Sequence, residues 1–209
     1  SDRIEPSQGS IIATKPDVVL TVASQVAEVG TNRLLSVAAG VTLTAIGEAT
    51  GGAIPIVRAM PNTPALVGEG AAAISGNANT DAEDLAWAEE ILGAVGTVVR
   101  TEEKLLDAVT GLSGSGPAYI FLVAEAMIDA GVMTGLSRTV STDLAVQTLL
   151  GASKLLAEGK PPAELRADVT SPGGTTAAGL RELENHGLRA AFAAAIEAAS
   201  RRSQELGQN

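Results

Sequence analysis

The sequence predicts an α/β region followed by an all-α region, and two observations predict this order. Through the first hundred residues, short apolar runs alternate with helix-compatible segments, which favours a parallel sheet with right-handed crossovers. Beyond Glu102 and Glu103, nearly every segment has helical character. We therefore expect an α/β domain over residues 1–102 and a helical domain over residues 103–209.

The α/β region contains five short segments that we expect to form strands, and most of them end at a proline, a glycine or a Lys-Pro pair. Between them lie two segments with a helical pattern. The expected strands are Ile11–Ala13, Leu34–Ala38, Ile54–Met60, Gly70–Ile74 and Thr97–Val99, and the expected helices are Pro16–Val29 and Asp81–Leu92.

The second region reads as five helices. Its first segment is apolar on most faces, which predicts a buried helix. Its last segment is rich in alanine, offers little bulk for the core of a monomer, and permits close approach of a second helix, so a helical dimer is plausible. The expected helices are Pro117–Ala130, Ser137–Glu158, Pro162–Ala167, Pro172–Asn185 and Leu188–Glu205.

Composition excludes several classes of function. The chain has no cysteine and only one histidine, so disulfides, thiolate catalysis and metal sites built on cysteine or histidine clusters are not expected. A net charge of −10 opposes binding to nucleic acid. No uninterrupted apolar stretch reaches membrane-spanning length, and the polar start is unlike a secretory signal. We therefore expect a cytoplasmic protein with no metal, nucleic-acid or membrane partner.

Two motifs combine glycines and small hydroxyl residues just before a helical segment. They are Asp107–Tyr119 (DAVTGLSGSGPAY) and Val169–Thr176 (VTSPGGTT). Ser171 can serve as an N-cap with Pro172 as the first helical residue, and Gly116-Pro117 repeats the arrangement. The free N–H groups of a helix start attract anions. Either motif alone is more simply a cap, but the two together suggest a site for a small acidic molecule.

These two motifs, together with Met60–Pro64 (MPNTP), resemble those of Δ1-pyrroline-5-carboxylate reductases, which catalyse the last step of proline synthesis. The resemblance runs from about Ile11 to Leu206. It implies an oxidoreductase that uses NADPH or NADH to reduce a cyclic imine acid. It also implies an incomplete Rossmann-type parallel sheet followed by a helical dimerisation domain, and a homodimer that assembles, in some members, into a larger ring of dimers.

The resemblance places the substrate carboxylate at the start of a helix and gives Thr176 a catalytic role, a hydrogen bond to the ring nitrogen. Glu103 matches an acidic position near the substrate. The alternatives are that the threonines only occupy a first helical turn and that Glu103 is a solvated carboxylate at a domain junction. Asp168 stands where the family often has an amide, which leaves its role open. The expected substrate-binding residues are Ser171, Gly173, Gly174, Thr175, Thr176 and Glu103.

The expected cofactor residues follow three strands, at the carboxyl edge where doubly wound sheets bind ligands. The family's Lys-Pro pair contacts the nicotinamide ribose, and small side chains after the next strand let the nicotinamide approach. The alternatives are a solvated Lys15 and an Asn62 that only bonds its own backbone in a rigid turn. For Ser113–Gly116 we favour packing over substrate binding. The expected cofactor-binding residues are Ala13, Thr14, Lys15, Pro16, Ala38, Ala39 and Asn62.

No glycine-rich G-x-G-x-x-G turn precedes Ile11, so we expect the resemblance to begin in the middle of the Rossmann domain. The choice between NADPH and NADH cannot be predicted without that segment. Two other functions stay open. A hydroxyacid-type dehydrogenase of the same architecture is disfavoured, because the residues after Lys154 include no amide. A non-catalytic helical dimerisation fragment is the second alternative.

Overall fold

The structure is a computed structural model that describes residues 7–207. The chain forms two compact units, one made of Ser1–Pro117 with Ala195–Asn209 and the other of Ala118–Ala194. The domain boundary expected at residue 102 stays a prediction. The compact units divide further along the chain, because the helical turn after residue 105 packs on the third and fourth strands.

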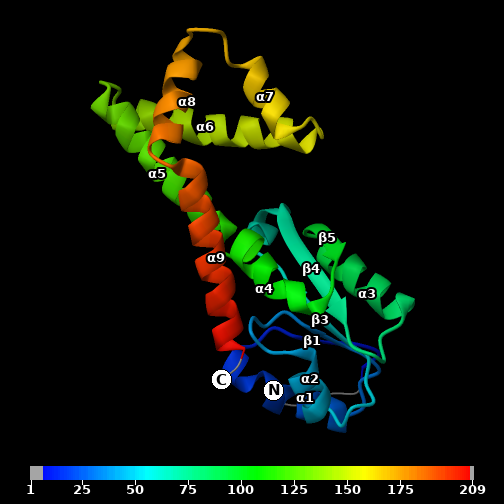
Figure 1. Ribbon diagram of the computed structural model, residues 1–209. Helices are drawn as coiled ribbons and strands as arrows, with labels where there is room; N and C mark the ends of the chain where they lie inside the picture. Colours follow the sequence, from blue (N-terminus) through cyan, green and yellow to red (C-terminus); the bar gives the residue numbers. More distant parts are fainter. Residues whose placement is uncertain (1–6, 208–209) are drawn as a thin grey trace. The chain divides into compact units, whose positions relative to one another are not determined.

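The first unit contains a five-stranded sheet in the order β1-β2-β3-β4-β5 (Figure 1). The sheet is mostly parallel, as predicted, but β3 and β4 pair antiparallel. Only a short helical turn, η2 (Thr63–Val67), joins these two strands, and a parallel crossover needs a dozen or more residues. The strands are β1 (Ser10–Ile12), β2 (Leu34–Ser36), β3 (Ile56–Met60), β4 (Gly70–Gly76) and β5 (Gly96–Arg100).

Helices cover both faces of this sheet, and alternate residues of the strands point to the two faces. Leu34 packs with the helices α1 (Val19–Glu28) and α2 (Leu43–Ala49), while its neighbour Leu35 packs with α3 (Ala82–Gly93). A short helical turn, η1 (Pro16–Val18), leads into α1. The sequence pattern predicts α1 and α3 but not α2, which has only seven residues.

A nearly continuous helical path follows the sheet. It runs through η3 (Glu103–Leu105), α4 (Leu106–Val109), the π-helical turn η4 (Thr110–Gly114) and α5 (Gly116–Met133). The Ser115 amide donates to the Thr110 carbonyl at 2.8 Å, a five-residue bond that carries the helix onward. Helix α5 begins at Gly116, as expected, but it follows the π-helical turn with only Ser115 between them, so the motif joins two helical segments.

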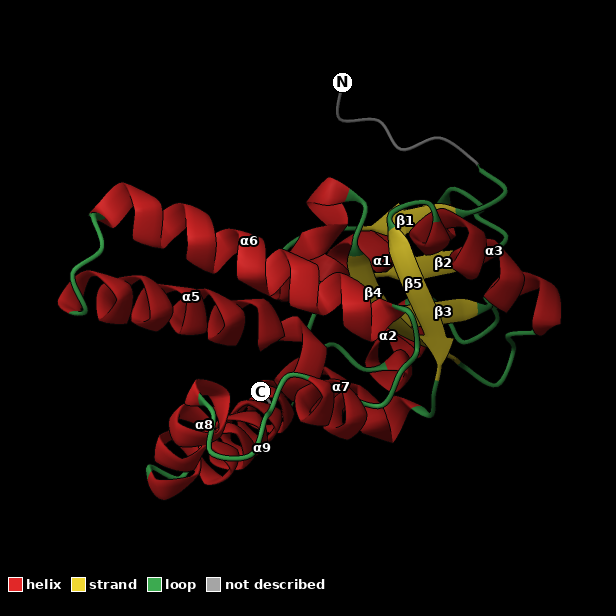
Figure 2. Cartoon of the chain, turned by 90° about the horizontal axis from the view of Figure 1, so that it is seen from above, coloured by secondary structure: helices red, strands yellow, loops and turns green. Residues whose placement is uncertain are grey.

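The second unit is helical. Helix α6 (Arg138–Ala157) follows α5 after a short loop, and the two helices contact each other near that loop (Figure 2). The Ser141 hydroxyl donates to the Ile128 carbonyl at 2.7 Å, and a Cβ atom on Gly131 would lie 2.1 Å from the Ser141 Oγ. Close packing of these helices therefore requires glycine at position 131. The chain continues through α7 (Pro162–Asp168), α8 (Thr175–Asn185) and α9 (Leu188–Leu206).

Helix α5 is apolar but has no buried residue in the described chain, so the expectation of a buried helix is wrong for a single chain. The side chains of Phe121 and Leu122 are 63% and 65% exposed. By length and composition alone, the stretch Glu103–Met133 would also be able to cross a membrane. Glycines and serines interrupt this stretch, so it contains no uninterrupted apolar run of membrane-spanning length.

Candidate active site

The carboxyl ends of β1 and β2 bring two of the expected cofactor segments together. The two strands pair parallel, and the Val37 amide donates to the Ile12 carbonyl at 3.1 Å just beyond them. A cavity of about 600 Å³ lies beside the loops that follow. Its lining includes Pro16, Leu20, Ala39, Gly40, Val41 and Leu206.

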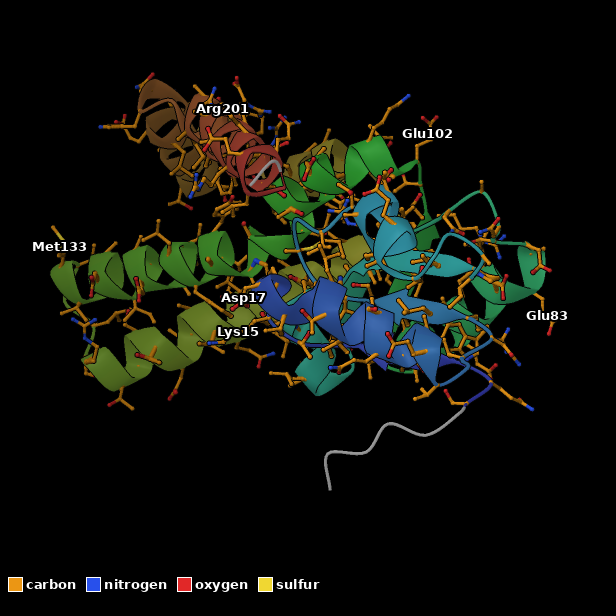
Figure 3. The ribbon with its side chains drawn as sticks, turned by 90° about the horizontal axis from the view of Figure 1, so that it is seen from below. Lys15, Asp17, Glu83, Glu102, Met133 and Arg201 are labelled. Carbon is orange, nitrogen blue, oxygen red and sulfur yellow. The ribbon has the colours of Figure 1, made fainter. Side chains whose placement is uncertain are left out.

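The loop after β2 is held in a shape that leaves room for a ligand. Gly40 has φ +78°, a backbone conformation that favours glycine. Ala38 is buried, and its amide donates to the Ser36 hydroxyl at 3.5 Å, so Ala38 supports the loop and does not line the cavity. Ala13 and Thr14 are exposed and also lie outside the lining. Lys15 is on the surface near the start of α1, close to Asp17 (Figure 3).

Asn62 follows β3, but its side chain bonds to other parts of the same unit. The Oδ1 atom accepts a hydrogen bond from the Ala71 amide at 2.8 Å, and the Nδ2 atom donates to the Ser113 carbonyl at 3.1 Å. The amide thus ties the end of β3 to the start of β4 and to the π-helical turn. Its role as a cofactor ligand stays a prediction. The alternative, a hydrogen bond from the Asn62 side chain to the backbone of its own turn, is wrong.

Glu103 lies in a structural contact that the sequence analysis did not identify. Its Oε1 atom accepts hydrogen bonds from the Leu43 amide at 2.7 Å and from Arg58 Nη1 at 3.0 Å. The Arg58 side chain is 7% exposed and that of Glu103 is 29% exposed. Glu103 therefore caps α2 and neutralises a charge inside the sheet, and it is not a freely solvated carboxylate. An arginine within the apolar run of β3 was the available signal for such a partner.

The loop Ser171–Thr176 has a different shape from the one expected. The Gly174 amide donates to the Ser171 carbonyl at 3.0 Å, and Gly173 has φ +71°. A proline followed by a glycine with positive φ is typical of a type II turn. Helix α8 therefore begins at Thr175 with Gly174 as its N-cap, and the expected cap at Ser171 with Pro172 as the first helical residue is wrong.

The start of α8 still presents the donors that the sequence analysis expected of it. The Ala178 amide makes the first bond within the helix, to the Gly174 carbonyl at 3.2 Å. The amides of Thr175, Thr176 and Ala177 precede it, and the first amides of a helix have no partner within the helix. Thr175 is exposed and Thr176 is half-buried. The turn thus places open backbone donors and two hydroxyl groups together.

Local bonds hold the segment that leads into this turn. The Thr170 hydroxyl donates to the Arg166 carbonyl at 2.6 Å, and the Thr170 amide donates to the Ala167 carbonyl at 3.0 Å. Asp168 forms an ion pair with Lys160, at the other end of α7. Asp168, which stands where the family often has an amide, is therefore paired with Lys160. A direct role of Asp168 in substrate binding stays open.

The other titratable side chains offer less. Among the described residues, no group of three or more histidine, cysteine, aspartate or glutamate side chains could hold a metal ion. His186 lies at the end of α8, where its Nδ1 atom is 2.8 Å from the Glu182 carbonyl oxygen. This is a local contact at a helix terminus.

Comparison with known proteins identifies the helical region. Residues 103–206 match the family model described as pyrroline-5-carboxylate reductase dimerisation. This region includes α5, where Phe121 and Leu122 are exposed in the single chain. The chain therefore forms a homodimer through its helical region.

Whole-chain relatives give the same result. The chain is 44% identical over 204 residues to a pyrroline-5-carboxylate reductase from Corynebacterium melassecola, covering 95% of this chain and 76% of that protein. It is 48% identical over 208 residues to the enzyme of that name from Synechocystis sp., covering 97% and 76%.

Solved structures agree in fold. The pyrroline-5-carboxylate reductase from Coxiella burnetii has a TM-score of 0.92 at 38% identity, over 97% of this chain and 77% of that one. The Plasmodium falciparum pyrroline carboxylate reductase, solved with NADP bound, has a TM-score of 0.86 at 35% identity, over 96% and 77%. The chain therefore belongs to the pyrroline-5-carboxylate reductase family.

Proposed function

We propose that this chain reduces Δ1-pyrroline-5-carboxylate to L-proline with NADPH or NADH. The observation that carries the proposal is the open helix start at Gly174–Thr176, in a chain 44–48% identical to proteins named for this reaction. A helix start with free amides suits a substrate that carries a carboxylate. These relatives favour imine reduction over the oxidation of a hydroxyacid and over a purely structural role.

The cavity beside β1 and β2 fits one end of a dinucleotide. Its volume of about 600 Å³ and its mostly apolar lining suit a flat ring and a sugar. When bound, NAD(P)H supplies a hydride to the imine carbon. In this proposal Pro16 and Ala39 contact the nicotinamide end, and Ala38 holds their loop. The roles of Ala13, Thr14, Lys15 and Asn62 in cofactor binding stay predictions.

The chemistry at the substrate requires a hydride at carbon and a proton at nitrogen. As the C=N bond is reduced, the ring carbon gains the hydride and the ring nitrogen gains one proton, taken from water. We assign the Thr176 hydroxyl as the donor that hydrogen-bonds the ring nitrogen and polarises the double bond. Ser171, Gly173, Gly174 and Thr175 shape the carboxylate site. Glu103 fixes the start of α2 through the Leu43 amide, and its part in substrate binding stays a prediction.

Assembly and location complete the proposal. The homodimer uses the helices within residues 103–206. We propose that dimers join into a larger ring and that the protein works in the cytoplasm. Light scattering of the purified protein measures the ring directly, because a dimer and a ring of dimers differ severalfold in mass.

Replacing Thr176 tests the proposal. Thr176→Ala should lower kcat/KM for pyrroline-5-carboxylate by roughly 10- to 1,000-fold, the effect of losing one preorganised donor. Thr176→Ser keeps the hydroxyl and should retain most of the activity. Circular dichroism and the KM for NADPH should stay unchanged in both variants. Thr176→Ala activity within twofold of wild type would remove this hydroxyl from the mechanism.

A further inference from the structure

The last turn of α9 borders the cavity beside β1 and β2. Leu206 and Gly207 line it together with Ala39 and Gly40, which lie more than 160 residues earlier in the sequence. A Cβ atom added to Gly207 would lie 2.9 Å from the Gly40 carbonyl oxygen. The end of the helix therefore packs directly on the loop that follows β2.

Two contacts fix α9 in this position. The Ser203 side chain is buried, and its hydroxyl donates to Asp107 Oδ1 at 2.6 Å. A Cβ atom on Gly111 would lie 2.6 Å from the Ile196 carbonyl oxygen, so the helix backbone rests on the π-helical turn. Because both contacts lie within the first compact unit, the last turn of α9 is a built part of that unit.

Leu206 leaves apolar surface at the cavity. Leu206 is 54% exposed. The helix that carries it is nevertheless held in place by the contacts of Ser203 and Ile196. Across the cavity, Pro16, Leu20 and Val41 provide further apolar surface. A ligand with an apolar face that enters here would cover Leu206 and gain the hydrophobic contribution of that burial.

We infer that the last turn of α9 forms one wall of the NAD(P)H pocket and that Leu206 contacts the bound cofactor. This inference rests on the proposed function, since it takes NAD(P)H as the occupant of the cavity. Its consequence is that residues near the end of the chain, far in sequence from every expected cofactor segment, set the affinity for the cofactor.

Three variants of the full-length protein test the inference. Leu206→Ala removes apolar contact and should weaken NADPH binding about 5- to 20-fold by calorimetry, with a matching rise in the KM for NADPH. Gly207→Ala should have a comparable effect, because its Cβ atom would push on the Gly40 carbonyl. Gln204→Ala, an exposed change on the same turn but outside the cavity, is the control and should leave both values unchanged.

The split between kinetic constants separates a cofactor contact from general damage. The KM for pyrroline-5-carboxylate, the kcat at saturating NADPH and the thermal midpoint should stay within about twofold or a few degrees of wild type. An unchanged NADPH affinity in Leu206→Ala, or an equal loss in Gln204→Ala, would overturn the inference. A wild-type protein that binds NADPH but does not reduce pyrroline-5-carboxylate would instead contradict the proposed function.

Discussion

Apolar side chains are shielded in the first compact unit and largely open in the second. Leu35, Ile56 and Ile74, which lie on both faces of the sheet, are fully buried between the sheet and its helices. In the helical unit, residues 118–194, only Ser141 and Ala145 are buried, and large apolar side chains such as Phe121 and Leu144 are more than half exposed. The first unit has a hydrophobic core of its own, whereas the second leaves most of its apolar surface open in the single chain.

This difference explains why the apolar helix α5 resembles a membrane-spanning helix when one chain is considered alone. The stretch Glu103–Met133 is apolar enough to pass as a membrane span when the chain is taken alone. The same stretch lies within the region that matches a dimerisation family, so we expect a partner chain to cover it. Exposed apolar surface on this scale is typical of obligate oligomers.

The largest expected effect tests the dependence of the second unit on its partner. Leu122→Asp should weaken the dimer by at least about 100-fold, because two carboxylates per dimer would enter an apolar interface. Light scattering at micromolar concentration measures the loss of dimer mass. Leu66→Asp changes a leucine outside residues 103–206 that is even more exposed, and it should leave the dimer intact. A stable Leu122→Asp dimer would place the interface elsewhere.

The next effect tests the independent core of the first unit. Ile74→Ala should lower the free energy of unfolding by about 2–5 kcal/mol, since it leaves a cavity among fully buried side chains. The dimer mass should not change at temperatures below unfolding. Thermal unfolding followed by circular dichroism gives the loss. A change of less than 0.5 kcal/mol, within about the range of surface substitutions, would show that this core is not packed as described.

A smaller effect concerns the contact between Glu103 and Arg58. Glu103→Gln should cost about 1–3 kcal/mol of stability, because it leaves the buried Arg58 without a counter-charge. Glu102→Gln provides the matched control. Glu102 is 71% exposed and pairs with Lys104 on the surface, so its loss should cost about 0–1 kcal/mol. Equal costs for the two variants would mean that burial does not strengthen the Glu103 pair.

The smallest effect is a pH dependence at the surface of the first unit. The hydrogen bonds from Arg100 to Glu89, at 2.5 and 2.6 Å, lower the pKa of the Glu89 carboxyl. A lowered folded-state pKa contributes stability above the unfolded pKa, about 4.3, and loses it as pH falls through the folded value. The difference in thermal midpoint between wild type and Glu89→Gln should therefore be present at neutral pH and disappear in acid. A pH-independent difference would contradict this assignment.

The sequence predicted the two-part fold and most of its helices and strands. Hydrophobic periodicity and stop residues located α1, α3 and the five helices of the second region. It did not show that β4 pairs antiparallel with β3, because strand direction depends on the length of the connection and not on the pattern within the strand. It also missed α2, whose seven residues are too few for a clear helical period.

The site was predicted less completely, for a physical reason. Motifs such as Ser171–Thr176 and Ala38–Gly40 are continuous in the sequence. Their residue types therefore indicate directly where hydrogen-bond donors lie and where a ligand can approach the backbone closely. The contacts of Asn62, Glu103 and Leu206 connect residues far apart in sequence, and no local pattern records such a partner. The cap at Ser171 was wrong because Pro172-Gly173 favours a turn as readily as a helix start.

The π-helical turn at Thr110–Gly114 also determines which way α5 faces. A turn of this kind holds one more residue than an α-helical turn, and each residue advances an α-helix by about 100°. Removing a single residue here would give a regular α-helical turn and leave later side chains pointing nearly as before, because the widened turn takes up the extra residue. Removing one from the regular first turn of α5 would instead rotate every later side chain by about 100° around the axis. Phe121 and Leu122 would then turn away from the direction in which they now point. The motif therefore tolerates a change of length that the helix beyond it does not, since a deletion there would alter the dimer surface without changing one residue of it.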